Sequence, residues 1–301
     1  MGIVLGPNQY GKAEIHLVRV YRNGPRHEIR DLTISSALRG DFSAAHVRGD
    51  QADVLPTDSQ KNTVFAFAKE KSIDAIEDFA LTLADHFLAQ VPIADGARIE
   101  IDEATWLRIE VDGEEHDHSF VRGGSGTRST IVNVDGRGSR RRAYVVSGIK
   151  DLVVLKSTGS EFKGFMKDTY TTLPEASDRI LATSLVARWR YEHTDVDWDK
   201  TYEAVKRLLL QRFAQIHSQA LQQTLYGMGE AALESHPEIA EIKFSAPNKH
   251  HFLVDLAPFG LDNPNEVFYA ADRPYGLIEA SVVRAGGSDP GSAWHAVPGW
   301  V

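Results

Sequence analysis

Two kinds of apolar periodicity alternate along this chain of 301 residues, and their order occurs twice. Each half begins with strand-like stretches, continues with residues that recur every three or four positions, as on a helix with one buried face, and ends with further strands. Such an order predicts an α+β fold in which helices cover one face of antiparallel sheets.

The first half opens with a predicted β-hairpin. Apolar residues alternate with polar ones at Ala13, Ile15 and Leu17, and a second alternating run reaches Ile34. The segment RNGP at 22–25 has turn chemistry, so we expect the two runs to pair.

Two helices are predicted next. Thr57 and Gln60 have the spacing of a capping box, which favours a helix that starts at this point. A second helix is expected over 74–90, because its apolar residues form one stripe: Ile76, Phe79, Leu83 and Phe87. Strands are then expected around 99–101, at 130–134 and at 144–146.

The second half has the same order of elements. Strand-like sequence reaches Leu155 and returns at 187–191, and two helical stripes follow: Tyr202, Val205, Leu209 and Phe213, then Leu221, Leu225, Met228 and Leu233. The last predicted strands are 242–244, 251–256, 267–271 and 277–283. Glycine and arginine interrupt the apolar pattern at 136–142, which predicts two domains, 1–140 and 141–301.

Composition excludes several classes of protein. Without cysteine there can be no disulfide, thiolate nucleophile or cysteine-held metal. A net charge of −9 disfavours nucleic acid as a partner, and no apolar run approaches the roughly 20 residues that span a bilayer. The N-terminal segment lacks the pattern of a secretory signal, and residues 298–301 (PGWV) are no peroxisomal address, so a cytoplasmic location is expected.

Several short segments carry a resemblance that goes beyond periodicity. They are NQYGK at 8–12, TDSQKNT at 57–63, LKSTGSEF at 155–162, DTYTTL at 168–173, DRIL at 178–181, PNKHH at 247–251 and NPNEVFYAADRPYGL at 263–277. In this order, and over nearly the whole chain, they resemble the signatures of the uricase family.

The resemblance implies a fold, an assembly and a reaction. It implies the tunnelling fold, with two tandem domains in each chain and a homotetramer that forms a barrel with active sites at subunit interfaces. The implied reaction is the oxidation of urate by O2 and water to 5-hydroxyisourate and hydrogen peroxide, without a metal or an organic cofactor.

Three residues match the family's catalytic positions. Lys12 corresponds to the catalytic lysine, which works with a threonine, here Thr57, supplied by a neighbouring subunit. His250 matches a histidine that assists proton transfer in the family. A desolvated lysine beside other cations loses its proton more easily, and a neutral imidazole can carry a proton near neutral pH.

Other residues match positions that hold the substrate. Arg179 offers a planar set of donors that suits an anionic purine, Gln222 can donate and accept, and Phe162 can stack on a flat ring. The resemblance adds the backbone N–H groups of Asp58 and Leu221, and Asn248, which would hold dioxygen or peroxide. Since Asn248 and His250 are two residues apart, we expect their side chains on one face of a strand.

Three other interpretations stay open at this stage. His116 and His118, also two residues apart, could face a metal and serve a metal-dependent hydrolase. The chain could belong to the pterin-related members of the tunnelling-fold group, which often use zinc. It could also be a noncatalytic purine-binding protein, which a peroxide assay would distinguish.

Overall fold

The computed structural model describes residues 2–295, so residues 298–301 lie outside the described part. The chain divides into two compact units. Of the described residues, the first comprises 2–148, 190–199 and 288–295, and the second comprises 149–189 and 200–287. Each unit combines antiparallel strand pairs with helices, which confirms the predicted α+β class.

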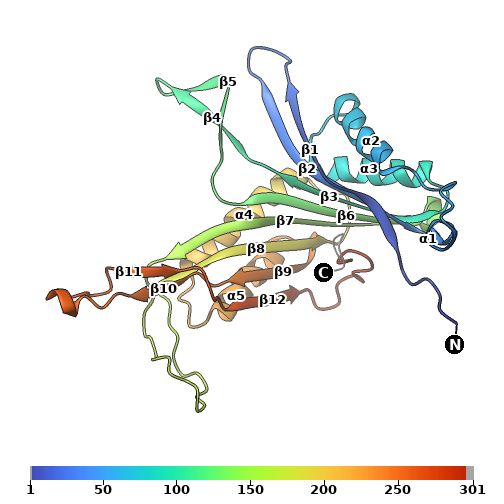
Figure 1. The fold of residues 1–301 in the computed structure, drawn as a ribbon. Helices are drawn as coiled ribbons and strands as arrows, with labels where there is room; N and C mark the ends of the chain where they lie inside the picture. Colours follow the sequence, from blue (N-terminus) through green and yellow to red (C-terminus); the bar gives the residue numbers. More distant parts are fainter. Residues whose placement is uncertain (1, 296–301) are drawn as a thin grey trace. The chain divides into compact units, whose positions relative to one another are not determined.

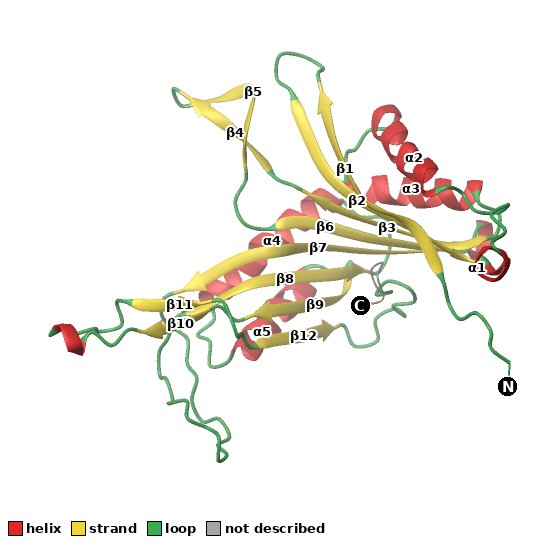
Figure 2. Ribbon diagram, in the orientation of Figure 1, coloured by secondary structure: helices red, strands yellow, loops and turns green. Residues whose placement is uncertain are grey.

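The sheet of the first unit is built around the predicted hairpin. β1 (Gln9–Tyr21) and β2 (Glu28–Gly40) pair antiparallel, followed by β3 (Ala94–Glu103), β6 (Thr127–Asp135) and β7 (Arg142–Lys156), whose first residues belong to this unit. The helices are α1 (Ser43–Arg48), α2 (Thr57–Glu70) and α3 (Ile76–Gln90). Figures 1 and 2 show α2 and α3 lying on one face of β1, β2 and β3.

The predicted stripe of α3 forms the core of this unit. Ile76, Phe79, Leu83 and Phe87 are all buried, and α3 packs on β3 and β6. Burying each such side chain contributes about 1.5–3 kcal/mol. The spacing of these residues therefore determines which face of the helix meets the sheet.

The start of α2 differs from the prediction. The residue before the helix is Pro56, and no side chain caps the first turn. Gln60, expected to close a capping box with Thr57, is buried and accepts a hydrogen bond from Ser36 of β2. The capping-box prediction was wrong because a tertiary partner binds the glutamine side chain.

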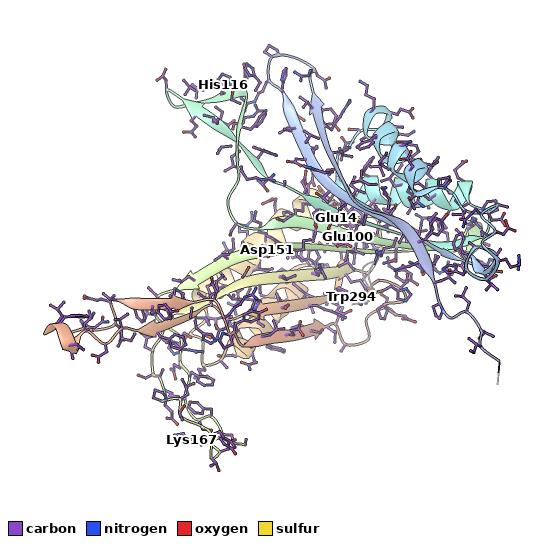
Figure 3. The ribbon with its side chains drawn as sticks, in the orientation of Figure 1. Glu14, Glu100, His116, Asp151, Lys167 and Trp294 are labelled. Carbon is purple, nitrogen blue, oxygen red and sulfur yellow. The ribbon has the colours of Figure 1, made fainter. Side chains whose placement is uncertain are left out.

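A second hairpin of the first unit carries the predicted histidine strand. β4 (Trp106–Val111) and β5 (Glu114–Arg122) meet at Asp112 and Gly113, both with positive φ, as a tight hairpin turn requires. Figure 3 places His116 on this hairpin. Several of its apolar side chains are exposed: Leu107, Ile109, Val111 and Val121.

The second unit repeats the combination of sheet and helices. Its strands are the end of β7, β8 (Leu181–Tyr191) up to residue 189, β9 (Ile239–Pro247) and β12 (Leu277–Val283), in that order, with a separate pair of β10 (His250–Leu253) and β11 (Phe268–Ala271). The helices are α4 (Trp198–Gln215), which belongs to this unit from residue 200, and α5 (Leu221–Ser235). The predicted strands at 251–256 and 267–271 pair only over the shorter spans of β10 and β11.

Close packing of α5 on β9 and β12 depends on a glycine. A Cβ at Gly229 would lie 2.6 Å from a methyl group of Val282 and 3.0 Å from the ring of Phe244. Both distances are shorter than van der Waals contact, so this position favours glycine even though glycine weakens a helix interior. The leucines and methionine predicted to face the sheet from α5 are buried.

Between β7 and β8 the chain forms a long loop without helix or strand, residues 157–180. Figure 3 shows Lys167 at the far end of this loop, extended away from the strands of the second unit. Two short 3-10 turns complete the described elements: η1 (Gly138–Arg140) and η2 (Ala257–Phe259). No helix in residues 2–295 is both long and apolar enough to cross a membrane.

Candidate active site

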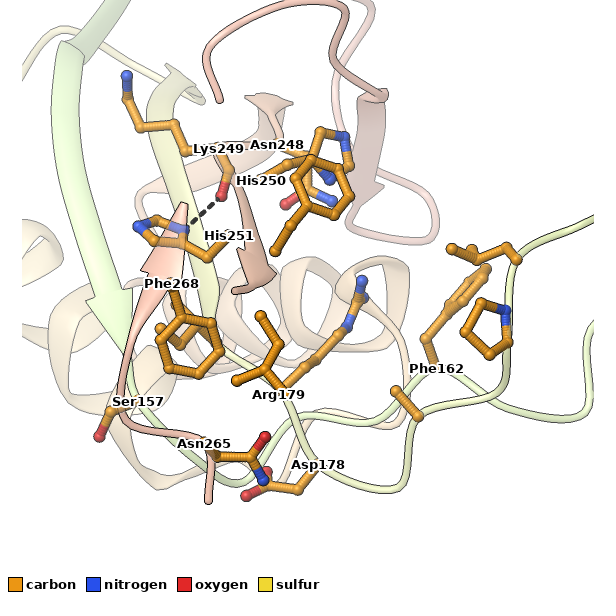
Figure 4. Close-up of a pocket in the computed structure, with 16 residues that line it drawn as sticks. Ser157, Phe162, Asp178, Arg179, Asn248, Lys249, His250, His251, Asn265 and Phe268 are labelled. Atoms are coloured by element: carbon orange, nitrogen blue, oxygen red, sulfur yellow. Dashed lines mark hydrogen bonds between the residues drawn. The ribbon is translucent and has the colours of Figure 1, made fainter. Parts of the chain in front are cut away.

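The second unit contains a cavity of about 540 Å³ between the loop 157–180 and the β10–β11 pair. Figure 4 shows the side chains that line it. The lining combines aromatic rings, one arginine and several polar groups: Ser157, Phe162, Leu173, Pro174, Ala176, Asp178, Arg179, Ile180, Asn248, Lys249, His250, His251, Phe252, Leu253, Asn265 and Phe268. Four of the predicted site residues therefore meet in one cavity.

Arg179 supplies a positive charge to this cavity. Figure 4 shows its guanidinium directed toward Asn248 and His250. No carboxylate within residues 2–295 forms an ion pair with Arg179, its Nε is buried without a hydrogen-bond partner, and burial lowers the pKa of the guanidinium. A partly desolvated cation without a counter-ion is a receptor for an anion.

Phe162 lies beside this cation and offers a flat apolar face. The carbon at the centre of the Arg179 guanidinium lies 5.0 Å from the centroid of the Phe162 ring, and the ring stacks on Phe165 at 4.7 Å. Backbone hydrogen bonds in both directions, each 2.8 Å, join Phe162 to Ala176 across the loop. The aromatic face is therefore fixed relative to the segment that leads to Arg179.

Asn248 and His250 line the same cavity, but they are not on one strand. β9 ends at Pro247 and β10 begins at His250, and Asn248 lies between them, where its N–H donates to the carbonyl of Gly276 at 2.8 Å. The predicted shared strand face was wrong because the chain leaves one strand pair and enters another at this point. The break nevertheless brings both side chains to the cavity.

Leu221 and Gln222 are the first two residues of α5 and are not among the residues that line the cavity. Leu221 is buried and Gln222 is exposed, whereas the neighbouring Gln223 accepts a hydrogen bond from the N–H of Gln219 at 2.9 Å. Of the two adjacent glutamines, Gln223 supports the helix start, and the side chain of Gln222 forms no hydrogen bond with any other residue in 2–295.

Hydrogen bonds tie the start of α5 to the Phe162 segment. The N–H of Glu161 donates to the carbonyl of Ser218 at 2.7 Å, and the N–H of Ser218 donates to the carbonyl of Gly159 at 2.8 Å. Phe162 and the first turn of α5 thus belong to one connected piece of the second unit.

Lys12, Thr57 and Asp58 lie in the first unit. Lys12 is a half-buried residue of β1, opposite Ser36 of β2 and next to a bulge. Thr57 is the first residue of α2, and its hydroxyl forms no hydrogen bond with any other residue in 2–295. A threonine hydroxyl without a partner, near a lysine, is chemically suited to pass a proton.

Asp58 shows that Lys12 and α2 approach each other within one chain. Its exposed carboxylate accepts hydrogen bonds from Lys61 at 2.5 Å and Asn62 at 3.0 Å. The hydrogen bond from Lys61 is the main cause of its lowered pKa, and the positive charge of Lys12 contributes as well. Lys12 therefore acts electrostatically on the first turn of the helix that begins with Thr57.

Asp178 is a functional candidate that the sequence analysis missed. Its carboxylate accepts hydrogen bonds from the hydroxyl of Thr158 at 2.6 Å and from the N–H groups of Gly159 at 2.9 Å and Ser160 at 3.4 Å. These bonds, that from Thr158 first, lower the pKa of Asp178. Its position next to Arg179 in the DRIL segment was the available signal.

The two histidines of the hydrolase alternative lie on β5. The rings of His116 and His118 are 4.5 Å apart, and the ring of His27 lies 5.8 Å from that of His118. Throughout residues 2–295, no group of three or more histidine, aspartate or glutamate side chains has the geometry to hold a metal ion.

Known proteins similar to this chain are uricases. The family model described as Uricase matches residues 8–133 and 145–279. The uricase of Arthrobacter globiformis is 54% identical over 298 residues, which cover 99% of this chain and 96% of that protein. The uricase of Oryctolagus cuniculus is 38% identical, over 91% of this chain and 93% of its own length.

Solved structures agree with the sequence relatives. The crystal structure of the Arthrobacter globiformis uricase matches with a TM-score of 0.93 and 54% identity, over 98% of this chain and all of that one. Urate oxidase from Bacillus sp. TB-90 shares the fold, with a TM-score of 0.81 at 22% identity, over 92% of this chain and all of that one. With both regions of the family model matched in order and relatives similar over nearly their full length, this chain belongs to the uricase family.

Proposed function

We propose that this chain, a urate oxidase by family, holds urate in the cavity of its second unit. The observation that carries the proposal is the guanidinium of Arg179, without a counter-ion in residues 2–295, beside the ring of Phe162. A planar anion satisfies both groups, because its carbonyl and ring nitrogen accept from the arginine while its face stacks on the phenylalanine. Gln222 and the N–H of Leu221 contribute polar contacts from the start of α5.

The chemistry begins with removal of a proton from the bound urate. Lys12 takes the proton through the hydroxyl of Thr57, and His250 assists the transfer. The N–H of Asp58, in the first turn of α2, donates to the purine. Asn248, which lines the same cavity as His250, holds dioxygen and then peroxide.

The deprotonated purine is a better electron donor, so dioxygen accepts two electrons from it and leaves as hydrogen peroxide. Water then adds to the oxidised ring. Urate, O2 and H2O thus give 5-hydroxyisourate and H2O2, with all atoms accounted for. In this scheme the protein supplies orientation and electrostatic support, and the electrons come from the substrate.

The proton relay formed by Lys12 and Thr57 meets the cavity of the second unit in an oligomer. Because α2, which begins with Thr57, packs on β1, which carries Lys12, we infer that Lys12 and Thr57 of one chain reach the site together. Each complete site then combines Lys12, Thr57 and Asp58 of one subunit with the cavity of another, in a homotetramer. Apolar residues exposed on the isolated chain, such as Leu107 and Val121 of the β4–β5 hairpin, support such an assembly.

A turnover assay tests the activity. Metal-stripped protein is mixed with urate in air, and near-ultraviolet absorbance, oxygen uptake and peroxide release are followed together. We expect one O2 consumed and one H2O2 released for each urate lost. Urate binding without oxygen uptake would identify a noncatalytic purine-binding protein, and turnover that requires added metal would contradict the proposed chemistry.

A mixing experiment tests the sharing of sites. At urate concentrations well below the parent KM, Lys12→Met and Arg179→Gln should each have little activity, the first because it lacks the proton relay and the second because it lacks the arginine that clamps urate. When the two variants are unfolded, mixed and refolded together, hybrid oligomers contain some sites with an intact relay from one chain and an intact cavity from the other. Recovered activity supports shared sites, whereas inactive hybrids of native size would place relay and cavity in the same subunit.

We further propose that this reaction takes place in the cytoplasm. Cell fractionation followed by the peroxide assay tests the location.

A further inference from the structure

A buried pair of polar side chains joins α2, which begins with Thr57, to β2, the strand that pairs with β1 at Lys12. The hydroxyl of Ser36 on β2 donates to Oε1 of Gln60 on α2 at 2.8 Å. Gln60 is fully buried and Ser36 is 1% exposed. We propose that Gln60 and Ser36 are positioning residues that set the distance between Lys12 and Thr57, an inference that rests on the relay proposed above.

On the strand side, Ser36 is the neighbour of Lys12. The two residues are directly opposite in the antiparallel pairing of β1 with β2, so their side chains leave the same face of the sheet. The preceding residue, Gly11, lies so close to β2 that a Cβ there would be 1.8 Å from the carbonyl oxygen of Ser36. Only glycine fits, and the backbone at Lys12 is therefore held tightly against Ser36.

On the helix side, Gln60 contacts the two residues that precede Thr57. Its backbone N–H donates to the carbonyl of Pro56 at 3.1 Å, and Nε2 of its side chain lies 3.5 Å from the carbonyl of Leu55, a long hydrogen bond. The Gln60 amide thus links Ser36, beside Lys12, to the segment that leads into Thr57.

Because the hydrogen bond between Ser36 and Gln60 is buried, it constrains the distance between α2 and β2. A buried hydroxyl or amide without a partner is unfavourable, so the pair strongly favours one separation of α2 and β2 at this point. Proton transfer through a hydroxyl depends steeply on distance, and a misplacement of about 1 Å can cost on the order of a hundredfold in rate. Loss of the pair should therefore affect the chemical step more than substrate binding.

The experiment compares Gln60→Met, Ser36→Ala and the double variant by steady-state kinetics in the oligomer. Methionine keeps about the volume of glutamine, but its thioether is only a weak acceptor for the Ser36 hydroxyl and has no N–H to donate. We expect Gln60→Met to lower kcat about tenfold, less than the roughly hundredfold that a misplacement of about 1 Å can cost. The KM for urate should change less than twofold, because the clamp residues belong to the second unit. The double variant should be no slower than Gln60→Met alone.

Thr130→Val is the matched control. Thr130 is a fully buried residue of the same unit, and its hydroxyl donates to the carbonyl of Val146 at 3.2 Å. Its loss should lower the melting temperature and leave kcat unchanged. The inference is overturned if Gln60→Met behaves like this control, losing stability at full kcat, or if Gln60→Met and Ser36→Ala act additively.

Lys12→Met, measured in the same series, separates the two proposals. If Lys12→Met is inactive and Gln60→Met has full kcat, the relay stands and the positioning inference fails. If Lys12→Met turns over normally, the relay itself is wrong.

Discussion

The two units of this chain hold their site residues by different means. In the first unit, Lys12 lies on a long strand and Thr57 begins a helix. A buried hydrogen bond joins Ser36, which is opposite Lys12, to Gln60 in the first turns of that helix. In the second unit, Phe162 and Arg179 lie on a loop of more than twenty residues, within which the exposed Asp178 accepts hydrogen bonds from Thr158 and Gly159. Proton transfer needs fixed distances, which regular elements provide, whereas a clamp for a flat anion can be built from a loop.

The largest effect should come from the first unit. Lys12→Met removes the proposed base, and general acid–base groups contribute about 10²–10⁴-fold to rates, so kcat should fall by at least a hundredfold. The affinity for urate, measured by equilibrium dialysis without oxygen, should stay within threefold. If Lys12→Met binds urate poorly but turns over at the normal rate, Lys12 holds the substrate and does not transfer the proton. The two units would then not differ in the roles proposed for them.

Arg179→Gln tests whether Arg179 clamps urate, and it should weaken urate binding while changing the rate of the bound substrate little. A hydrogen bond from a charged group contributes about 1.5–3 kcal/mol, so the dissociation constant for urate should rise roughly tenfold to a hundredfold. Single-turnover kinetics at saturating urate should show a rate much closer to that of the parent protein. Arg179→Lys keeps the charge without the planar set of donors and should recover part of the affinity. An unchanged dissociation constant in Arg179→Gln would contradict the clamp.

Phe162→Leu removes the aromatic face and keeps an apolar side chain. An aromatic pair contributes about 0.5–1.5 kcal/mol beyond its buried area, so the dissociation constant should rise about threefold to tenfold. Phe165→Leu is the matched control, since Phe165 stacks on Phe162 but is not among the residues that line the cavity. Equal losses in both variants would mean that the rings stabilise the loop and do not stack on substrate.

Asp178→Asn should give the smallest effect and a dependence on pH. An exposed group contributes little, so KM should rise only about threefold at neutral pH. The pKa of Asp178 is lowered in the folded chain, so the stability from its ionised form is full above the usual aspartate range and is lost as pH falls through the lowered pKa. The melting temperatures of the parent protein and Asp178→Asn should therefore converge in acid. A constant difference between them at all pH values would show that the carboxylate does not support the loop.

Much of the fold was predictable because a helix or strand with one buried face has apolar residues at regular intervals in its sequence. Ile76, Phe79, Leu83 and Phe87 predict both the existence of α3 and the face that it buries. The start of α2 was predicted from Thr57 and Gln60 for a local reason that the structure contradicts, since Gln60 binds Ser36 on another strand. Local rules do not include a partner that lies 24 positions away.

The site was predictable only in part. Motif resemblance named Phe162, Arg179, Asn248 and His250, which meet at one cavity, but it did not indicate Asp178 as the support of the loop. Nor did spacing place Asn248 and His250 correctly, because the break between β9 and β10 leaves no periodic signal. The roles assigned to all the site residues stay predictions, as does the boundary between domains 1–140 and 141–301; these residues are Lys12, Thr57, Asp58, Phe162, Arg179, Leu221, Gln222, Asn248 and His250.

By itself, the sequence determined the class of fold, the buried faces of the helices and, through its motifs, the family. These properties depend on short-range spacing and on residue identity, which are written in the chain directly. Only the tertiary structure decided that Arg179 has no counter-ion in residues 2–295, that Phe162 lies against it, and that Gln60 binds Ser36. Such contacts join residues far apart in the chain, and their energies depend on burial and distance, which exist only once the chain has folded.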